Sequence, residues 1–167
     1  MDFYTERLVI RPITADDKEA VLDLLTDKTV AKTYMLPVYQ KREDAEPLFQ
    51  RLVQMGMDES RYVAGVYLKG QFIGMMNAVE IKGDQIEMGY AYLPAYYNRG
   101  YATEAFKGAI DYLLDSGFAT VLAGAFSNNS ASLRVMEKCG MKKQDYTDEL
   151  EYRGITYTCI YYAAQRE

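Results

Sequence analysis

The sequence contains no histidine and no tryptophan among its 167 residues. Histidine is the commonest general base and metal ligand near neutral pH, so its absence excludes Ser-His and Cys-His catalytic pairs. Any chemistry that this chain performs must therefore use carboxylates, hydroxyls, backbone amides or a cofactor.

Cysteine is rare as well, with Cys139 and Cys159 as its two occurrences. They stand in unlike local contexts and lack the paired spacing of a metal site or a disulfide framework. We interpret both as reduced thiols in a cytoplasmic protein, since free thiols are typical of reducing compartments. The sequence predicts no metal site.

Long hydrophobic runs are missing too. The start, MDFYTERLVIRP, carries charges where a signal peptide needs an apolar core, and no later segment offers ~18 uninterrupted apolar residues for a membrane span. The formal net charge of −5 argues against binding to nucleic acid through phosphate contacts, because such proteins usually present a basic surface. We therefore expect neither a membrane nor a nucleic-acid partner.

What is present fits one domain over residues 1–167, because a chain of this length with 49% hydrophobic residues can bury a substantial core. Alternation with period two predicts strands, and apolar spacings of three and four predict helices. The expected strands span residues 7–14 (stopped at Pro12), 62–70, 71–84, 85–94, 118–127, 145–154 and 155–164. The expected helices span residues 15–27, 42–56, about 101–114 and 129–140.

This order of elements predicts an α+β fold. Turn signals at Lys69-Gly70 and Lys82-Gly83-Asp84 join three strands into an antiparallel meander. The strand over residues 118–127 should run parallel to the last meander strand, because a helix crosses between the two.

The stretch YNRG, Tyr97 to Gly100, precedes an amphipathic helix. The first amides of a helix lack partners and carry partial positive charge, so such an end binds anions. Gly100 permits positive φ, Asn98 tolerates the left-handed region and Arg99 adds a cation, which predicts a backbone cradle for phosphate. The alternative is a plain tight turn. The stretch matches neither GxxxxGK[ST] nor GxGxxG, so nucleoside-triphosphate and dinucleotide binding are poorly supported.

These features occur in an order that resembles the GNAT superfamily of acyl-CoA N-acyltransferases, and within it the RimJ/RimL-like branch. Four stretches carry the resemblance and cover nearly the whole domain: TERLVIRPITADD, EMGYAYLPAYYNRGYATEA, NSASLRVMEKCGM and YRGITYT…YY. The resemblance implies the GNAT fold, with a mixed central sheet of about seven strands flanked by about four helices. That sheet combines an antiparallel meander with a parallel, splayed pair of strands.

The resemblance also implies where acetyl-CoA, the expected cosubstrate, binds. The diphosphate would meet the loop and first helical turn, which hold Asn98, Arg99, Gly100, Tyr101, Ala102 and Thr103. The pantetheine arm would enter the cleft between the splayed strands, where the amide near Tyr92 or Leu93 would face the thioester oxygen. Asn129 would lie beside the arm, or serve only as a helix N-cap. Four basic residues would either meet the CoA phosphates or only solubilise exposed helices: Arg99, Lys107, Arg134 and Lys138.

The leaving group of such a reaction is the thiolate of coenzyme A, and a proton or hydrogen-bond donor at its sulfur would assist its departure. Many family members carry a tyrosine seven residues after the asparagine, as the acid that protonates the thiolate, and this chain has Met136 there. Ser132, as in RimL-like relatives, is the substitute that we expect. The alternative for Ser132 is an ordinary residue of the first helical turn.

The attacking amine must lose a proton, since an alkylamine has a pKa of about 10 and an α-amine about 8. Glu87 alternates onto the same strand face as Gly89 and Ala91 and is the predicted base, acting directly or through water. Glu80 is a weaker candidate. The alternative for Glu87 is a solvated carboxylate or the partner of an arginine.

The leading hypothesis is an acetyl-CoA-dependent N-acetyltransferase that acts on a primary amine by direct attack on the thioester. The alternative is a non-catalytic acyl-CoA-binding sensor, which the loss of tyrosine at Met136 favours and which Glu87 and Ser132 disfavour. The acceptor, a protein N-terminus or a small molecule, stays open, as does the choice between monomer and homodimer. Several tyrosines would either line an acceptor pocket or fill strands: Tyr34, Tyr39, Tyr90, Tyr92, Tyr157, Tyr161 and Tyr162.

Overall fold

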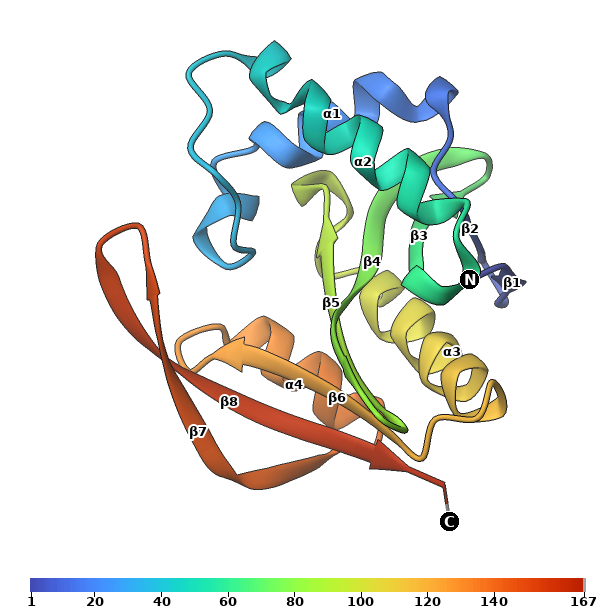
Figure 1. Cartoon of the computed structure of the whole chain (residues 1–167), viewed down its shortest axis with the longest axis vertical. Coiled ribbons are helices and arrows are strands. Elements are labelled where there is room, and N and C mark those ends of the chain that lie inside the picture. Colours follow the sequence, from blue (N-terminus) through green and yellow to red (C-terminus); the bar gives the residue numbers. More distant parts are fainter. Residues whose placement is uncertain (167) are drawn as a thin grey trace.

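A computed structural model describes residues 1–166, and in these residues eight strands form one mixed sheet (Figure 1). The spatial order is β1-β2-β3-β4-β5-β6-β8-β7. The strands are β1 (Phe3–Tyr4), β2 (Leu8–Arg11), β3 (Val63–Leu68), β4 (Gln71–Lys82), β5 (Gln85–Tyr92), β6 (Thr120–Phe126), β7 (Lys142–Tyr152) and β8 (Ile155–Gln165). The predicted α+β fold with a mixed sheet is confirmed.

The sheet has one strand more than the seven expected. The additional strand, β1, is two residues long and pairs antiparallel with β2. Two residues are too few to show alternation, so the sequence pattern gave no signal for it. Phe3 also stacks on Tyr112, with ring centroids 5.3 Å apart, which joins the N-terminus to the longest helix.

In residues 1–166, four α-helices cover the two faces of the sheet in pairs (Figure 1). They are α1 (Lys18–Thr26), α2 (Glu46–Gly56), α3 (Tyr101–Asp115) and α4 (Ser130–Lys138). Buried side chains of α1 and α2 pack against one face, and those of α3 and α4 pack against the other. The four predicted helices are therefore confirmed, and each face of the sheet has its own hydrophobic core.

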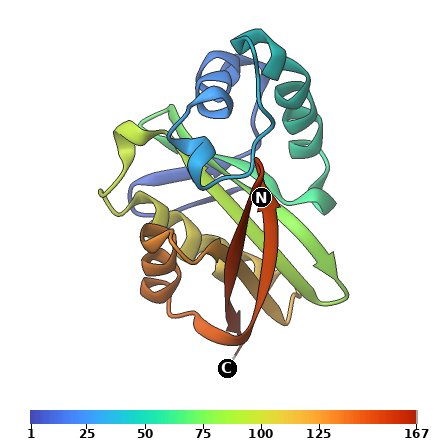
Figure 2. The same ribbon diagram turned by 90° about the vertical axis from the view of Figure 1, so that its left-hand side faces the viewer.

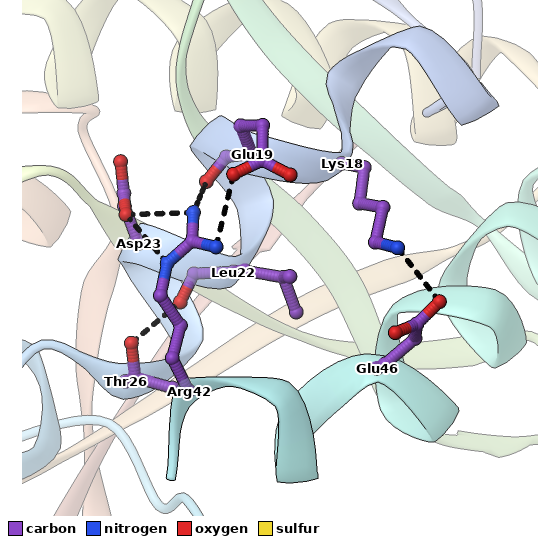
Figure 3. A network of polar contacts seen from close by, with 7 residues as sticks. All are labelled: Lys18, Glu19, Leu22, Asp23, Thr26, Arg42 and Glu46. Carbon is purple, nitrogen blue, oxygen red and sulfur yellow. Dashed lines mark hydrogen bonds and ion pairs between the residues drawn. The ribbon is translucent and has the colours of Figure 1, made fainter.

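Ion pairs tie α1 to the chain that leads into α2 (Figure 3). Arg42, in a short 3₁₀ turn at Arg42–Ala45, reaches Glu19 at 2.9 Å and Asp23 at 3.0 Å. Lys18 and Glu46 form a further pair at 2.7 Å. These partly exposed pairs fix the two helices relative to each other.

The meander runs as predicted. β2, β3, β4 and β5 pair in antiparallel order, and the β3–β4 hairpin turns through Lys69 and Gly70, whose φ angles are 49° and 81°. Two consecutive positive φ angles match the right-handed twist of the flanking strands. The turn after β4 uses Gly83, with a φ of 59°.

Within residues 1–166, β5 and β6 form the one parallel pair of strands, and α3 connects them as predicted. Their pairing covers Gln85–Glu87 and Thr120–Leu122 and ends there. Beyond Glu87 the two strands separate, β5 continuing to Tyr92 and β6 to Phe126 (Figure 1). The sheet is therefore split at its centre, with Glu87 at the point of divergence.

The last hairpin, β7–β8, turns at Arg153 and Gly154 and leans toward the chain between α1 and α2 (Figure 2). The Tyr152 hydroxyl donates a hydrogen bond to the Ala31 carbonyl at 2.6 Å and accepts one from the Leu36 backbone N–H at 3.2 Å. One hydroxyl thus joins the tip of this hairpin to a loop on the α1–α2 face.

Candidate functional site

The loop before α3 has the backbone conformation that the sequence predicted. Asn98 and Gly100 both have positive φ, 60° and 81°. Gly100 is the N-cap residue of α3 and provides no side-chain cap. The first intrahelical bond runs from the Glu104 N–H to the Gly100 carbonyl at 3.0 Å. The amides of the first three helical residues come before Glu104 and therefore have no acceptor within the helix.

Those three amides belong to Tyr101, Ala102 and Thr103, and they lie at the positive end of a helix of 15 residues. Arg99 and Gly100, just before them, are exposed. An anion can therefore approach this end of α3 from solvent. The geometry meets the requirements of a diphosphate cradle that does not depend on any side-chain cap.

Arg7 braces this loop, which the sequence did not indicate. Its guanidinium donates from Nε to Glu104 Oε2 at 2.6 Å and from Nη1 to the Arg99 carbonyl at 3.2 Å. It also lies over the ring of Tyr101, 4.6 Å from the centroid. A β-carbon at Gly100 would stand 3.3 Å from Arg7 Nη2, so glycine also leaves room for this contact.

The two backbone amides expected to face a thioester differ in their availability. The Leu93 N–H already donates to the Ile73 carbonyl of β4 at 2.9 Å, so the expectation for Leu93 as a free donor is wrong. Hydrogen-bond direction alternates along a strand, so the Tyr92 N–H points to the opposite edge of β5. That edge is where β6 has diverged, so of the two amides the Tyr92 N–H is the one directed toward the divergence.

The side chain of Tyr92 belongs to the core and not to this edge. Its ring lies against Gly74, where a β-carbon would stand 2.5 Å from a ring carbon. Its hydroxyl is buried and has no hydrogen-bond partner within residues 1–166. Burial strongly raises the pKa of this phenol, so it stays neutral.

The start of α4 lies on the α3 side of the divergence. Asn129 is its N-cap, and its side-chain oxygen accepts from the Ser132 N–H at 3.2 Å. Ser132 Oγ lies 2.8 Å from the hydroxyl of Tyr90 on β5. Met136, where the wider family's tyrosine is expected, is fully buried in the core between sheet and helices. A tyrosine at this position would have to displace core side chains.

Glu87 lies on the other face of β5 from Tyr90, as alternation requires. Its pKa is raised above the ordinary value, first by burial and then by the negative charges of Glu80 and Asp148, while Lys82 opposes the rise. Glu80 faces Glu87 across the β4–β5 pair and is held by Lys82, whose Nζ is 2.9 Å from its carboxylate. A carboxylate of raised pKa is a stronger base than one in open water.

The surroundings of Glu87 continue into a polar wall on the α1–α2 face. The Tyr34 hydroxyl donates to Asn77 Oδ1 at 2.6 Å, and both side chains lie within 4 Å of the point where a Gly89 β-carbon would be. Burial raises the pKa of Tyr34 to about 12. A β-carbon at Gly89 would also stand 3.3 Å from Val79 Cγ2, so the glycine lets this wall pack closely against β5 beside the divergence.

The end of α4 contacts the beginning of α3. Cys139 Sγ donates to the Thr103 carbonyl at 3.5 Å, and burial raises the pKa of this thiol to about 11. Lys138 is the exposed residue just before it. This contact places Lys138 on the last turn of α4, near the first turn of α3. Both cysteines are free, as predicted.

In the part of the chain described by the structure, no group of three or more carboxylate or thiol side chains could hold a metal ion. No helix in residues 1–166 is long and apolar enough to cross a bilayer.

The mixed sheet that splits between two central parallel strands, followed by a helix without a side-chain N-cap, is the architecture that this chain shares with a solved GNAT acetyltransferase. The chain belongs to the GNAT acetyltransferase family: its residues 7–142 match the family model described as "Acetyltransferase (GNAT) domain".

Individual proteins agree with this assignment. The chain is 26% identical to the uncharacterized N-acetyltransferase YoaA of Bacillus subtilis, over 91% of this chain and 89% of that protein. A solved GNAT acetyltransferase from Bacillus anthracis superposes with a TM-score of 0.85 at 27% identity, covering 99% and 98% of the two chains. RimL, a ribosomal L7/L12 α-N-protein acetyltransferase solved with coenzyme A, shares the fold at 14% identity, with a TM-score of 0.83 over 96% and 95%.

Proposed function

We propose that this acetyltransferase uses acetyl-CoA to acetylate a primary amine, and that the amine attacks the thioester directly. One observation carries the proposal: the sheet divides immediately after Glu87, with a carboxylate on one face and a hydroxyl pair on the other. An amine can lose its proton on the Glu87 face while the thiolate departs on the Ser132 face. No side chain has to perform both tasks.

Acetyl-CoA would lie with its diphosphate at the N-terminus of α3 and its arm along the free edge of β5. The amides of Tyr101, Ala102 and Thr103 would bind the diphosphate, with Arg99 and Lys138 adding positive charge. Asn129 would lie beside the arm while its side-chain oxygen caps α4. The Tyr92 N–H would then donate to the thioester oxygen.

The reaction follows from these placements. Glu87 takes a proton from the ammonium form of the acceptor, directly or through water, and the free amine attacks the carbonyl carbon. Negative charge develops on the oxygen, where a fixed backbone donor such as the Tyr92 N–H is worth on the order of 3 kcal/mol. The C–S bond breaks, its electron pair goes to sulfur, and the Ser132 hydroxyl donates a hydrogen bond to that sulfur. The nitrogen, positively charged after its attack, loses its second proton to water.

A covalent acyl-cysteine route is disfavoured. The nucleophile in such a route is a thiolate, yet burial raises the pKa of Cys139 to about 11 and also raises that of Cys159. Both cysteines therefore stay as thiols near neutral pH. This supports direct transfer from acetyl-CoA to the acceptor.

The acceptor is expected to approach as a cation. Glu80, Glu87 and Asp148 concentrate negative charge on one side of the divergence, which favours an ammonium group. The RimL structure concerns an enzyme that acts on a protein α-amine. A peptide N-terminus and a small amine both satisfy the charge requirement. The absence of a tyrosine at Met136 is the feature that favours the alternative, a non-catalytic sensor, whereas Glu87 and Ser132 favour catalysis.

The test is thiol release from acetyl-CoA with a panel of N-terminal peptides and small amines, followed by Glu87→Gln on the best acceptor. We expect turnover by the wild type. The variant should lose most activity near neutral pH and recover partly as pH rises, because the amine then loses its proton unaided. Glu149→Gln is the matched control, since this exposed carboxylate lies on the edge strand β7 and accepts a hydrogen bond from Thr158 of β8. Wild-type turnover without any dependence on Glu87 over roughly pH 6 to 9 would reject it as the base.

A further inference from the structure

Two hydroxyl groups meet where β5 faces the first turn of α4. Tyr90 Oη lies 2.8 Å from Ser132 Oγ and 3.3 Å from the Ser132 carbonyl oxygen. The Tyr90 ring is held by Phe106 of α3, at a centroid distance of 4.9 Å, and by Tyr92, at 6.2 Å. Packing on both sides therefore fixes the position of the Tyr90 hydroxyl.

We propose that Tyr90 is a positioning residue that turns the Ser132 hydroxyl proton toward the sulfur of bound coenzyme A. This inference rests on the proposed acetyl transfer and identifies what orients the group at its leaving atom.

The hydrogen bonds of Ser132 explain why it needs such a partner. A helical serine commonly donates its proton to a carbonyl of the preceding turn, and a proton used in this way cannot reach a ligand. In the described residues, the hydroxyl of Ser132 makes its one hydrogen bond with Tyr90. Its backbone N–H is already bound by Asn129.

The direction of the short bond decides where the serine proton points. A phenol is the stronger acid of the two hydroxyls and therefore the better donor. When Tyr90 donates to Ser132 Oγ over 2.8 Å, the single proton of Ser132 is free to donate to a third atom. The reverse arrangement leaves Tyr90 with the longer contact of 3.3 Å to a helix carbonyl.

Burial keeps Tyr90 protonated, so that it continues to donate its hydrogen bond to Ser132 Oγ. It raises the pKa of Tyr90, so the phenol stays protonated throughout the neutral range and remains a donor to Ser132. During the reaction the C–S bond breaks and its electron pair stays on sulfur, stabilised by the serine O–H. The thiolate then takes its proton from solvent. The two protons of the acceptor nitrogen leave separately, the first to Glu87 before the attack and the second to water. Neither hydroxyl has to ionise.

The experiment measures the thiol pKa of coenzyme A in its complex with the protein, without any acceptor. Thiolate absorbance is recorded against pH, and the desulfo-CoA complex is subtracted to remove the protein's own titration. The variants are Tyr90→Phe, Ser132→Ala and the double variant. The control is Tyr162→Phe, which removes a tyrosine hydroxyl bonded to Glu137 of the same helix at 2.9 Å.

The wild-type complex should show a thiol pKa below that of free coenzyme A. Tyr90→Phe should raise it by about one unit, a tenfold change in acidity, and Ser132→Ala should raise it by at least as much. The thiol pKa in the double variant should match that in Ser132→Ala, because the two substitutions act on the same hydrogen bond, the one from the Ser132 hydroxyl to the sulfur. In turnover, Tyr90→Phe should lower kcat about tenfold and leave KM for acetyl-CoA nearly unchanged.

A Tyr90→Phe complex with the wild-type thiol pKa would overturn the inference, and so would a double variant whose shift equals the sum of two independent shifts. The Tyr162→Phe complex should show the wild-type thiol pKa. If this variant raised the thiol pKa as much as Tyr90→Phe does, the loss of any hydrogen bond to α4 would explain the shift, and Tyr90 would have no specific role. A wild type that binds coenzyme A and acetylates no amine contradicts the proposed function alone, because the thiol titration still decides the role of Tyr90.

Discussion

The guanidinium Nε of Arg7 lies 2.6 Å from Oε2 of Glu104, although 97 positions separate the two residues. The backbone N–H of Arg7 adds a second bond to the same carboxylate at 2.7 Å. Glu104 belongs to the first turn of α3, and the other side of the guanidinium holds the Arg99 carbonyl. This pair therefore fixes the loop whose amides are proposed to bind the CoA diphosphate.

Arg7→Ala should weaken coenzyme A binding by about tenfold, since the loop would have to be ordered at the expense of binding free energy. The free energy of unfolding should change little, because the ion pair is partly exposed. Calorimetric titration with coenzyme A and thermal unfolding measure the two effects. Arg42→Ala is the matched control: it breaks ion pairs with Glu19 and Asp23, neither of which belongs to this loop (Figure 3). If Arg7→Ala and Arg42→Ala bound coenzyme A with equal affinity, Arg7 would not be needed to order the loop before α3.

Gly100→Val should abolish measurable binding of coenzyme A while the protein still folds. The glycine φ of 81° is strained for any β-branched residue, and the added β-carbon would stand 3.3 Å from Arg7 Nη2. Gly70→Val is the control, because Gly70 has the same φ of 81° and nothing within 4 Å of the point that an added β-carbon would occupy. Both variants should lose similar stability, and calorimetry should find the affinity loss in Gly100→Val alone. Unchanged affinity in Gly100→Val would place the diphosphate elsewhere.

Local sequence signals were sufficient for the fold and for the loop. The turn residues Asn98 and Gly100 predicted a backbone geometry that the structure contains, because positive φ is chemically encoded at the position itself. The alternation that placed Glu87 on one strand face is likewise local. The identification of the parallel pair followed from a crossover helix between two strands.

Long-range partners were not predictable in the same way. Arg7 and Glu104, or Tyr90 and Ser132, are ordinary residues in their own segments, and only the folded chain brings them together. The expectation for Leu93 failed because its amide is used by Ile73, and amide direction depends on register rather than residue type. Packing rather than spacing decided that Met136 lies in the core.

Glu80→Gln should move the acidic limb of the pH–rate profile to lower pH. The negative charge of Glu80 raises the pKa of Glu87, so its removal lets Glu87 lose its proton at lower pH and act as a base there. Lys82, no longer paired with Glu80, would also lower the pKa of Glu87. The measurement is kcat/KM against pH with a saturating acyl donor. A limb that stays in place or moves upward contradicts the proposed coupling, and Glu149→Gln should leave it unmoved.

Tyr92→Phe should stabilise the protein by about 1 kcal/mol, because the buried hydroxyl of Tyr92 has no partner within residues 1–166 and its desolvation costs free energy. CoA affinity should stay at the wild-type value, since only the backbone N–H of this residue is proposed to act. Tyr67→Phe should shift stability in the opposite direction, because the Tyr67 hydroxyl donates to Asp17 at 2.7 Å. Denaturant unfolding compares the two variants. A destabilised Tyr92→Phe would show that the hydroxyl is bonded in solution.

Tyr152→Phe should raise the KM for the acceptor and leave the affinity for coenzyme A unchanged. The hydroxyl holds the Ala31 carbonyl and the Leu36 N–H, and its loss leaves both backbone groups of the loop between α1 and α2 without this partner. That loop also carries Tyr34, which bonds Asn77 beside Gly89 on the Glu87 face. Steady-state kinetics with each substrate varied in turn separates the two effects. Tyr67→Phe removes a comparable buried hydrogen bond from the other end of the same face and should change stability without changing the KM for the acceptor. If Tyr152→Phe raised the KM for acetyl-CoA instead, the β7–β8 hairpin would act on the cosubstrate side of the divergence, and the placement of the acceptor on the Glu87 face would be wrong.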